Sequence, residues 1–283
     1  MEHAGGAAYA LEMAPFEREL ERGASIETLA LRVAKDRYPA LSIEVELARI
    51  DAFAAPLSAV PLAGANPREQ HAALEGRIAD ELGFSGNEND YHDPRNSYLH
   101  EVIARRVGLP ITLAVMWIAI ARRAGIPVSG VGFPGHFLVR VGAASSEESV
   151  LADPFRGGAL VGPAELTRLS SHHLGGIKHL QPNHLAETDP KTMLIRMLVN
   201  LKHAHGKHGD HAGALLVAQR LVELTGSVVF MRDRGLHAMA LGAKDGALAD
   251  FDRYLLAGAP EGDAAAIQRL RAQLVTRAKS VLQ

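Results

Sequence analysis

Apolar residues recur at helical spacing through roughly the first eighty residues of the chain. Between Ala7 and Leu82, positions such as Leu29 and Val33 are interleaved with charged residues in the pattern of amphipathic helices. Prolines at positions 15, 39, 56 and 61 interrupt the pattern. Because proline removes a backbone donor and clashes with the preceding helical turn, this region is predicted to form several short helices.

The pattern then changes to turn residues and to two further helices. Residues 83–97 are rich in glycine, asparagine and aspartate, which is typical of turns. A helix is predicted from Tyr98 to Gly108, with Asn96 or Ser97 as its N-cap and Glu101 near the position of a capping box. A second and strongly apolar helix is predicted over residues 110–125.

Strand-like segments follow at residues 128–131, 137–141 and 150–152, and the last two are expected to form a hairpin. From Lys191 onward the pattern is helical only, at roughly 191–205, 211–224, 230–242, 246–257 and 263–281. The chain is therefore predicted to be α+β in its middle and all-α at its end.

Part of the C-terminal pattern has the spacing of a helical repeat. Ala214 and Ala247 lie 33 residues apart in similar settings, close to the 34-residue tetratricopeptide period. Gly235, Phe251 and Pro260 fall near the small, aromatic and proline positions of that repeat. Because two such repeats are too few to be stable alone, they are expected to pack against the preceding domain.

Composition excludes several classes of function. The 283 residues suggest about two domains, and 30 Lys+Arg against 32 Asp+Glu leave no basic surplus for nucleic acid. The uncharged stretch 107–121 is shorter than the roughly 20 residues that cross a bilayer, so no membrane partner is expected. The start of the chain does not resemble a secretory signal, which predicts a cytoplasmic protein. The absence of cysteine excludes disulfides, thiolate metal sites and a cysteine nucleophile.

Two short matches to known motifs lack the context that each motif requires. The segment 130–135 matches a dinucleotide-binding fingerprint, but a strand is predicted after it where a helix is needed. His100-Glu101 begins like a zinc-protease motif, but Ala104 occupies the position of the second histidine. Two histidine groups could ligate a metal if folding assembled them, although surface histidines are the favoured interpretation: His203, His205, His208 and His211, and His172, His173, His179 and His184. No metal or cofactor is predicted.

His136 and Asp153 form the strongest candidate for chemistry. His136 follows Gly135 and precedes a strand whose hairpin partner ends at Asp153. Adjacent strands can place an imidazole beside a carboxylate, which is how a general base is oriented. A half-buried structural hydrogen bond between the two is an equally good interpretation from spacing alone.

Several segments of the chain resemble the transglutaminase-like superfamily, which includes papain-like cysteine transferases and proteases. The segments are Gly108-Leu109-Pro110, the helix running to Gly125-Ile126-Pro127, Gly135-His136-Phe137 and Asp153-Pro154. The longer stretches 96–99, 133–140 and 153–158 are similar to the SirB-type bacterial branch, in which tetratricopeptide-like repeats follow the domain. The resemblance covers roughly residues 40–275 and implies a papain-like α+β core.

The resemblance also assigns roles, and one of them is not filled. In catalytic members a cysteine opens the central helix 15 residues before Gly-Ile-Pro, and here that position is Pro110. His136 and Asp153 match the family's base and orienting acid. Proline suits the first helical turn, so this replacement is expected to preserve the helix while it removes the nucleophile. Thr112 should face away from that position, whereas Ser97 or a water molecule activated by His136 stays open.

The leading hypothesis is a catalytically inactive transglutaminase-like protein that acts as a protein- or peptide-binding or regulatory module. The alternative is a hydrolase or acyl transferase acting on amide bonds, with His136, Asp153 and a nucleophile other than cysteine. Three regions are expected: a helical region at 1–85 packed on the core, the core at 86–190, and helical repeats at 191–283. The candidate binding residues are Asn96, Ser97, Tyr98, Phe133 and Phe155.

Overall fold

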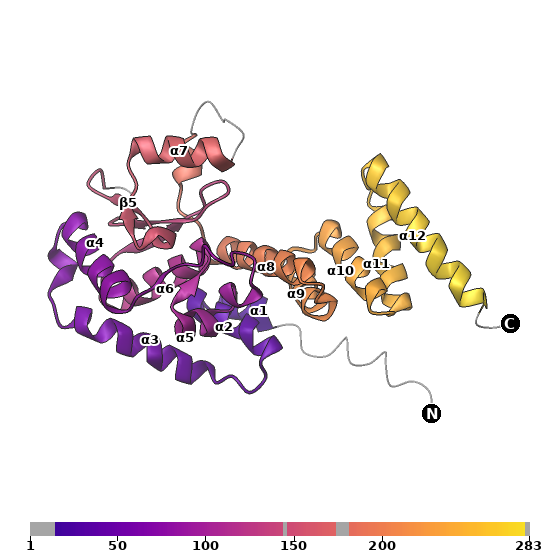
Figure 1. Ribbon diagram of the computed structural model, residues 1–283, viewed down its shortest axis with the longest axis horizontal. Helices are drawn as coiled ribbons and strands as arrows, with labels where there is room; N and C mark the ends of the chain where they lie inside the picture. Colours follow the sequence, from indigo (N-terminus) through magenta and orange to yellow (C-terminus); the bar gives the residue numbers. More distant parts are fainter. Residues whose placement is uncertain (1–14, 144–145, 174–180, 281–283) are drawn as a thin grey trace. The chain divides into compact units, whose positions relative to one another are not determined.

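The computed structural model describes residues 15–143, 146–173 and 181–280. These residues form two compact units, one of residues 19–197 and the other of residues 198–280 with residues 15–18. Helices α1 (Pro15–Glu21) and α8 (Pro190–Lys207) each cross a boundary between the units (Figure 1). Among the described residues, no helix combines the length and the apolar character that a membrane crossing requires.

The larger unit begins with helices, as the sequence predicts. They are α2 (Ile26–Arg37), α3 (Ile43–Ser58), the 3-10 turn η1 (Leu62–Gly64), α4 (Pro67–Glu75) and a π-helical turn, η2 (Gly76–Glu81). The expectation that Pro56 separates two helices is wrong, because Pro56 lies inside α3. It occupies the last turn of that helix, so the hydrogen bond that it removes lies at the end of the helix.

A short helix and a long buried helix follow. The 3-10 turn η3 (Pro94–Asn96) leads into α5 (Leu99–Arg105). The predicted helix end at Gly108 is wrong, because Arg106 adopts a left-handed conformation with φ of 65° and ends the helix earlier. Strand β2 (Val107–Gly108) then pairs in parallel with β1 (Ser85–Gly86). Helix α6 (Pro110–Arg123) follows directly, and 11 of its 14 residues are buried.

An antiparallel sheet completes the α+β core and confirms the predicted fold class. Its strands, in spatial and chain order, are β3 (Val128–Val131), β4 (Leu138–Val141), β5 (Val150–Asp153) and β6 (Ala159–Leu160). Leu138 packs with Leu166 and Leu169 of α7 (Pro163–His173). Helix α6 contacts β3 and β4, and Figure 1 shows α6 and α7 on opposite sides of the sheet. The 3-10 turns η4 (Pro154–Arg156) and η5 (Pro182–Leu185) lie in the connections.

The smaller unit is helical in its described part, as predicted. It contains α9 (His211–Thr225), α10 (Val228–Ala240), α11 (Lys244–Leu256) and α12 (Glu261–Ser280). Phe251 of α11 is fully buried and lies against Gly235 of α10, where an added Cβ would come within 2.8 Å of the ring. A residue without a side chain is therefore needed at that crossing. The interpretation of these helices as tetratricopeptide-like repeats stays a prediction.

Candidate functional site

Helix α6 begins at Pro110, the first residue with helical geometry, as the sequence predicts. Proline loses nothing there, because the first backbone N–H groups of a helix have no partner within the helix. Leu109 precedes the helix in an extended conformation, and its N–H donates to the Thr112 hydroxyl at 2.9 Å. The same hydroxyl donates to the Asn96 carbonyl at 2.8 Å. The start of α6 is thus closed by a side chain and tied to the segment before α5.

His136 and Asp153 are brought together by the antiparallel register of β4 and β5. Val139 pairs with Ala152, so the residues just before β4 lie beside the end of β5. His136 Nε2 lies 2.9 Å from Asp153 Oδ1, and the two side chains are 9% and 1% exposed. The carboxylate thus lies at ion-pair distance from Nε2, and Nδ1 is the ring nitrogen at the other end.

Asp153 is held by the turn that follows it. Its Oδ1 also accepts the Phe155 N–H at 3.0 Å, and its carbonyl accepts the Gly158 N–H at 2.8 Å. The Phe155 ring packs on Gly86, where an added Cβ would come within 2.5 Å of the ring. The same ring lies edge-on to His136, with centroids 6.2 Å apart. A glycine in β1 is therefore required for Phe155 to occupy its place beside the pair.

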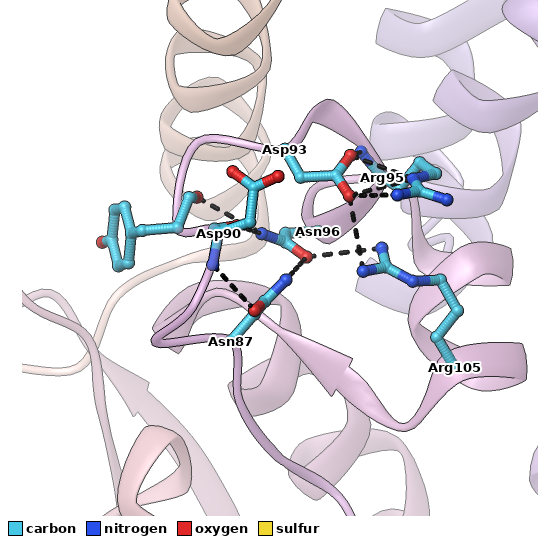
Figure 2. Close-up of polar contacts among 7 residues, drawn as sticks. Asn87, Asp90, Asp93, Arg95, Asn96 and Arg105 are labelled. Carbon is cyan, nitrogen blue, oxygen red and sulfur yellow. Dashed lines mark hydrogen bonds and ion pairs between the residues drawn. The ribbon is translucent and has the colours of Figure 1, made fainter.

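Asn96 is the centre of a polar network over the start of α6, which Figure 2 shows. Its side chain is fully buried, and its Nδ2 donates to the Asp90 carbonyl at 2.7 Å and to the Tyr91 carbonyl at 3.3 Å. Its Oδ1 accepts from Asn87 at 2.9 Å and from Arg105 at 3.4 Å. Both ends of the amide are satisfied, so Asn96 fixes the loop 87–91.

The same network contains a buried carboxylate. Asp93 is 5% exposed and lies within ion-pair distance of Arg95 at 2.7 Å and of Arg105 at 3.4 Å (Figure 2). Burial alone would raise the pKa of Asp93, but hydrogen bonds and charge from Arg95 outweigh it and lower the pKa. Asp93 therefore stays ionised and helps to hold the loop against α5.

Of the two hydroxyls near the start of α6, Thr112 was expected to face away from the nucleophile position, and Ser97 stayed open as a replacement. The Thr112 hydroxyl is committed to Leu109 and to the Asn96 carbonyl, so it does not serve the imidazole. The Ser97 hydroxyl is buried and makes no hydrogen bond with any residue in the described ranges. Neither hydroxyl is therefore hydrogen-bonded to His136.

The remaining candidate binding residues are largely enclosed. Tyr98 is 3% exposed and packs edge-on against Tyr38, and Phe133 is fully buried between the sheet and α7. The expectation that Asn96 or Ser97 is the N-cap of the next helix is wrong, because Tyr98 occupies that position. Asn96 is instead the last residue of the 3-10 turn η3. Its side-chain amide donates to the Asp90 carbonyl in the loop before that turn, so it does not cap α5.

Two residues near His136 were not singled out from the sequence. Arg196 of α8 donates from Nη2 to the His136 carbonyl at 2.9 Å and to the Phe133 carbonyl at 3.3 Å. Tyr91, which is 41% exposed, lies edge-on to Phe155 with centroids 5.8 Å apart. Arg196 is 60 residues from His136 along the chain, and no motif links the two. Arg196 and His136 come together only because of the place where α8 packs.

The structure assembles no metal site in the ranges that it describes, since no three histidine, aspartate or glutamate side chains there converge. His205 pairs with Asp210 at 2.9 Å, and His211 lies 3.2 Å from His237. His179 and the side chains of His172 and His173 lie outside the described residues. The segment 130–135 covers the end of β3 and the turn before β4, so a strand and not a helix follows it.

Comparison with known proteins agrees with this geometry. Residues 44–199, more than half of the chain, match the transglutaminase-like superfamily. The chain belongs to the transglutaminase-like superfamily. A UPF0162 protein of Xylella fastidiosa (strain Temecula1) is 38% identical over 232 residues, which are 80% of this chain and 81% of the relative. A UPF0162 protein of Vibrio cholerae is 27% identical over 259 residues, 89% and 93% of the two chains.

A shorter match lies in a different kind of protein. Human F-box only protein 21 is 43% identical over 68 residues, which are 24% of this chain and 11% of that protein. No solved structure matches the chain. The transglutaminase-like assignment thus rests on sequence, and the structure adds the positions of Pro110, His136 and Asp153.

Proposed function

We propose that this chain is a catalytically inactive member of the transglutaminase-like superfamily that binds a protein or peptide at the site around His136 and Asp153. The observation that carries the proposal is Pro110 at the first residue of α6. The resemblance places the nucleophilic cysteine of catalytic members at this position. A proline side chain has no ionisable hydrogen and no lone pair with which to attack a carbonyl.

The neighbouring groups support the loss of chemistry. The chain has no cysteine anywhere, so no thiol can replace the missing one. The Thr112 hydroxyl closes the start of the helix, and the Ser97 hydroxyl is not hydrogen-bonded to the imidazole. An acid–base pair without a nucleophile can still accept and donate hydrogen bonds to a ligand.

The retained features favour binding. His136 and Asp153 are oriented by strand register and by the turn at Phe155, so their polar atoms are fixed in place. Tyr91 and Phe155 add aromatic surface next to them. Aromatic side chains supply large contact area at small entropic cost, which suits a peptide-binding site. The helices of the smaller unit add a surface of the kind that repeat proteins use to bind partners.

Peptide selection tests this proposal directly. The full chain is used to select peptides from a random display library, and the affinities of selected peptides are measured by calorimetry. Binding is expected to weaken at least tenfold in His136→Ala and to be unchanged in His208→Ala, an exposed histidine directly after α8. Hydrolysis of amide substrates or acyl transfer to amines that disappears in His136→Ala would refute the inactive assignment.

A hydrolase is the second candidate, because His136 Nε2 lies 2.9 Å from Asp153 Oδ1, close enough for the carboxylate to assist a general base. In this scheme a water molecule gives a proton to the imidazole and attacks the acyl carbon. The imidazolium then returns the proton to the departing amine as the carbon–nitrogen bond breaks. Release of ammonia or amine from amide substrates, dependent on both residues, would establish this candidate.

A further inference from the structure

Arg196 has a charge that no carboxylate of the described residues balances. This half-buried arginine of α8 donates from Nη2 to two backbone carbonyls and lies over the Phe137 ring, 5.0 Å from its centroid. None of the carboxylates in the described ranges forms an ion pair with it. Backbone carbonyls and an aromatic face offset only part of the cost of burying a charge.

The remaining donors of Arg196 are free to bind. Its Nε and Nη1 donate to no described residue, and neither is among the enclosed side-chain atoms without a partner, so both retain contact with solvent. Nη1 lies over Gly132, where an added Cβ would come within 2.7 Å of it. A residue without a side chain thus leaves space for the guanidinium at this point of the loop.

Two other half-buried arginines of this unit also lack a carboxylate partner among the described residues, but their surroundings differ. Arg106 lies between the Phe53 and Phe84 rings, and its Nη1 is enclosed. Arg140 donates to the Ser149 hydroxyl and to a backbone carbonyl, and its Nε is enclosed. Arg196 differs from both because it contacts the backbone of His136 and keeps two donor groups open.

The surroundings of Arg196 connect it to the candidate site. Burial lowers the pKa of Arg196, and the charge of Tyr91 raises it in part. Burial in turn raises the pKa of Tyr91, and the Arg196 charge lowers it in part. Tyr91 contacts Phe155, and Phe155 contacts His136. A ligand seated on these rings would meet the positive charge of Arg196, whereas the Asp153 carboxylate nearby already lies against His136.

We propose that Arg196 binds a carboxylate of the peptide that occupies the site at His136 and Asp153. This inference rests on the proposed binding function and specifies its ligand as an acidic peptide. The carboxylate belongs either to an aspartate or glutamate side chain or to the C-terminus of the peptide. Both sources present the same anionic oxygens, and hydrogen bonds between ions are stronger than those between neutral groups.

The first measurement tests carboxylate binding on the wild-type chain with small molecules, so it does not depend on any selected peptide. The Nε–Hε resonance of Arg196 in the full chain, assigned by its absence in Arg196→Lys, is followed by nuclear magnetic resonance during titration with N-acetylglutamate. N-acetylglutaminamide, in which both carboxylates are replaced by amides, and inorganic phosphate are titrated at the same ionic strength. A saturable shift with N-acetylglutamate that exceeds those with the other two probes is expected. Equal shifts with all three, or none, would overturn the carboxylate site.

The second measurement uses the peptides selected on the full chain. They are expected to be enriched in acidic residues, and their dissociation constants should rise about tenfold or more in Arg196→Gln. Arg140→Gln, which removes the same charge from a half-buried arginine of the same unit, should change them less than twofold. Peptides with glutamate replaced by glutamine, or with an amidated C-terminus, identify the carboxylate that matters.

The outcomes separate the two proposals. Selected peptides that bind Arg196→Gln as tightly as the wild type refute the role of Arg196 and leave the binding function intact. Failure to select any peptide refutes the binding function and, with it, the acidic-peptide ligand. A dissociation constant that rises equally in Arg196→Gln and Arg140→Gln also refutes the role of Arg196, because the effect is then one of net charge.

Discussion

A cysteine in place of Pro110 should become an activated thiol. The chain has no other cysteine, so the introduced thiol can be followed without interference. Proline suits the first position of α6 but is not required there, and its removal should cost only about 0.4–1 kcal/mol of stability through the unfolded state. The Pro110→Cys variant therefore tests whether the helix start, His136 and Asp153 still have the geometry of catalytic family members.

The expected shift follows from three contributions. A helix N-terminus favours a thiolate by about 0.3–1 kcal/mol. A thiolate about 4 Å from an imidazolium gains roughly 4 kcal/mol at an effective dielectric constant of about 20. At about 1.36 kcal/mol per pKa unit these effects amount to roughly three units, and burial at position 110 opposes them. The thiol pKa should therefore fall from about 8.5 to about 6–7.5.

The rate of iodoacetamide alkylation, followed by mass spectrometry from pH 5 to pH 10, measures this pKa. Pro163→Cys is the matched control, because Pro163 also begins a helix but is exposed on α7. Its thiol should titrate within about one unit of the ordinary value. In the double variant Pro110→Cys/His136→Ala, the thiol pKa should rise most of the way back to its ordinary value. A thiol at position 110 whose pKa is the same with and without His136 would refute the assignment of position 110 as the nucleophile position.

Three further predictions concern stability and are measured by urea unfolding. Asn96→Ala should lower the free energy of unfolding by about 2–4 kcal/mol, because its buried partners lose hydrogen bonds. Asn89→Ala, at an exposed position, should have little effect, and equal effects of the two substitutions would contradict the role of Asn96. Gly86→Ala should cost about 1–3 kcal/mol by displacing the ring packed on it, and Gly64→Ala, with open space around it, serves as the control. Burial lowers the pKa of His100, so the unfolded chain binds more protons at this residue than the folded chain does. The free energy of unfolding should therefore fall as the pH drops through about 6.5. His100→Gln should reduce this dependence of stability on pH, and an unchanged dependence would contradict the prediction.

The sequence predicted the elements whose pattern is carried by buried positions. The long helix beginning at Pro110, the hairpin that ends at Asp153 and the C-terminal helices all have a strong apolar period or a clear proline or glycine signal. Helix α7 was not predicted, because only a few apolar residues, such as Leu166 and Leu169, face the sheet among many polar ones. Its existence depends on the strands that it covers.

Candidate site residues were predictable where a motif or strand register placed them. His136 and Asp153 could be paired because adjacent strands carry them. The function of Asn96 as the centre of a buried network could not be predicted, because its partners come from the loop before it and from α5. Arg196 had no signal at all, since its proximity to His136 depends on where α8 lies.

The turn between Asp153 and Gly158 is clamped at both ends by aromatic rings resting on glycines. Phe155 lies on Gly86, and Trp117 lies on Gly158, where added Cβ atoms would come within 2.5 Å of the rings. A receptor immobilised in this way loses little of its own conformational freedom when it captures a ligand. Most of the conformational entropy lost on binding is then lost by the ligand. Cyclic or otherwise rigid ligands, which have less to lose, should therefore bind more tightly than flexible ones.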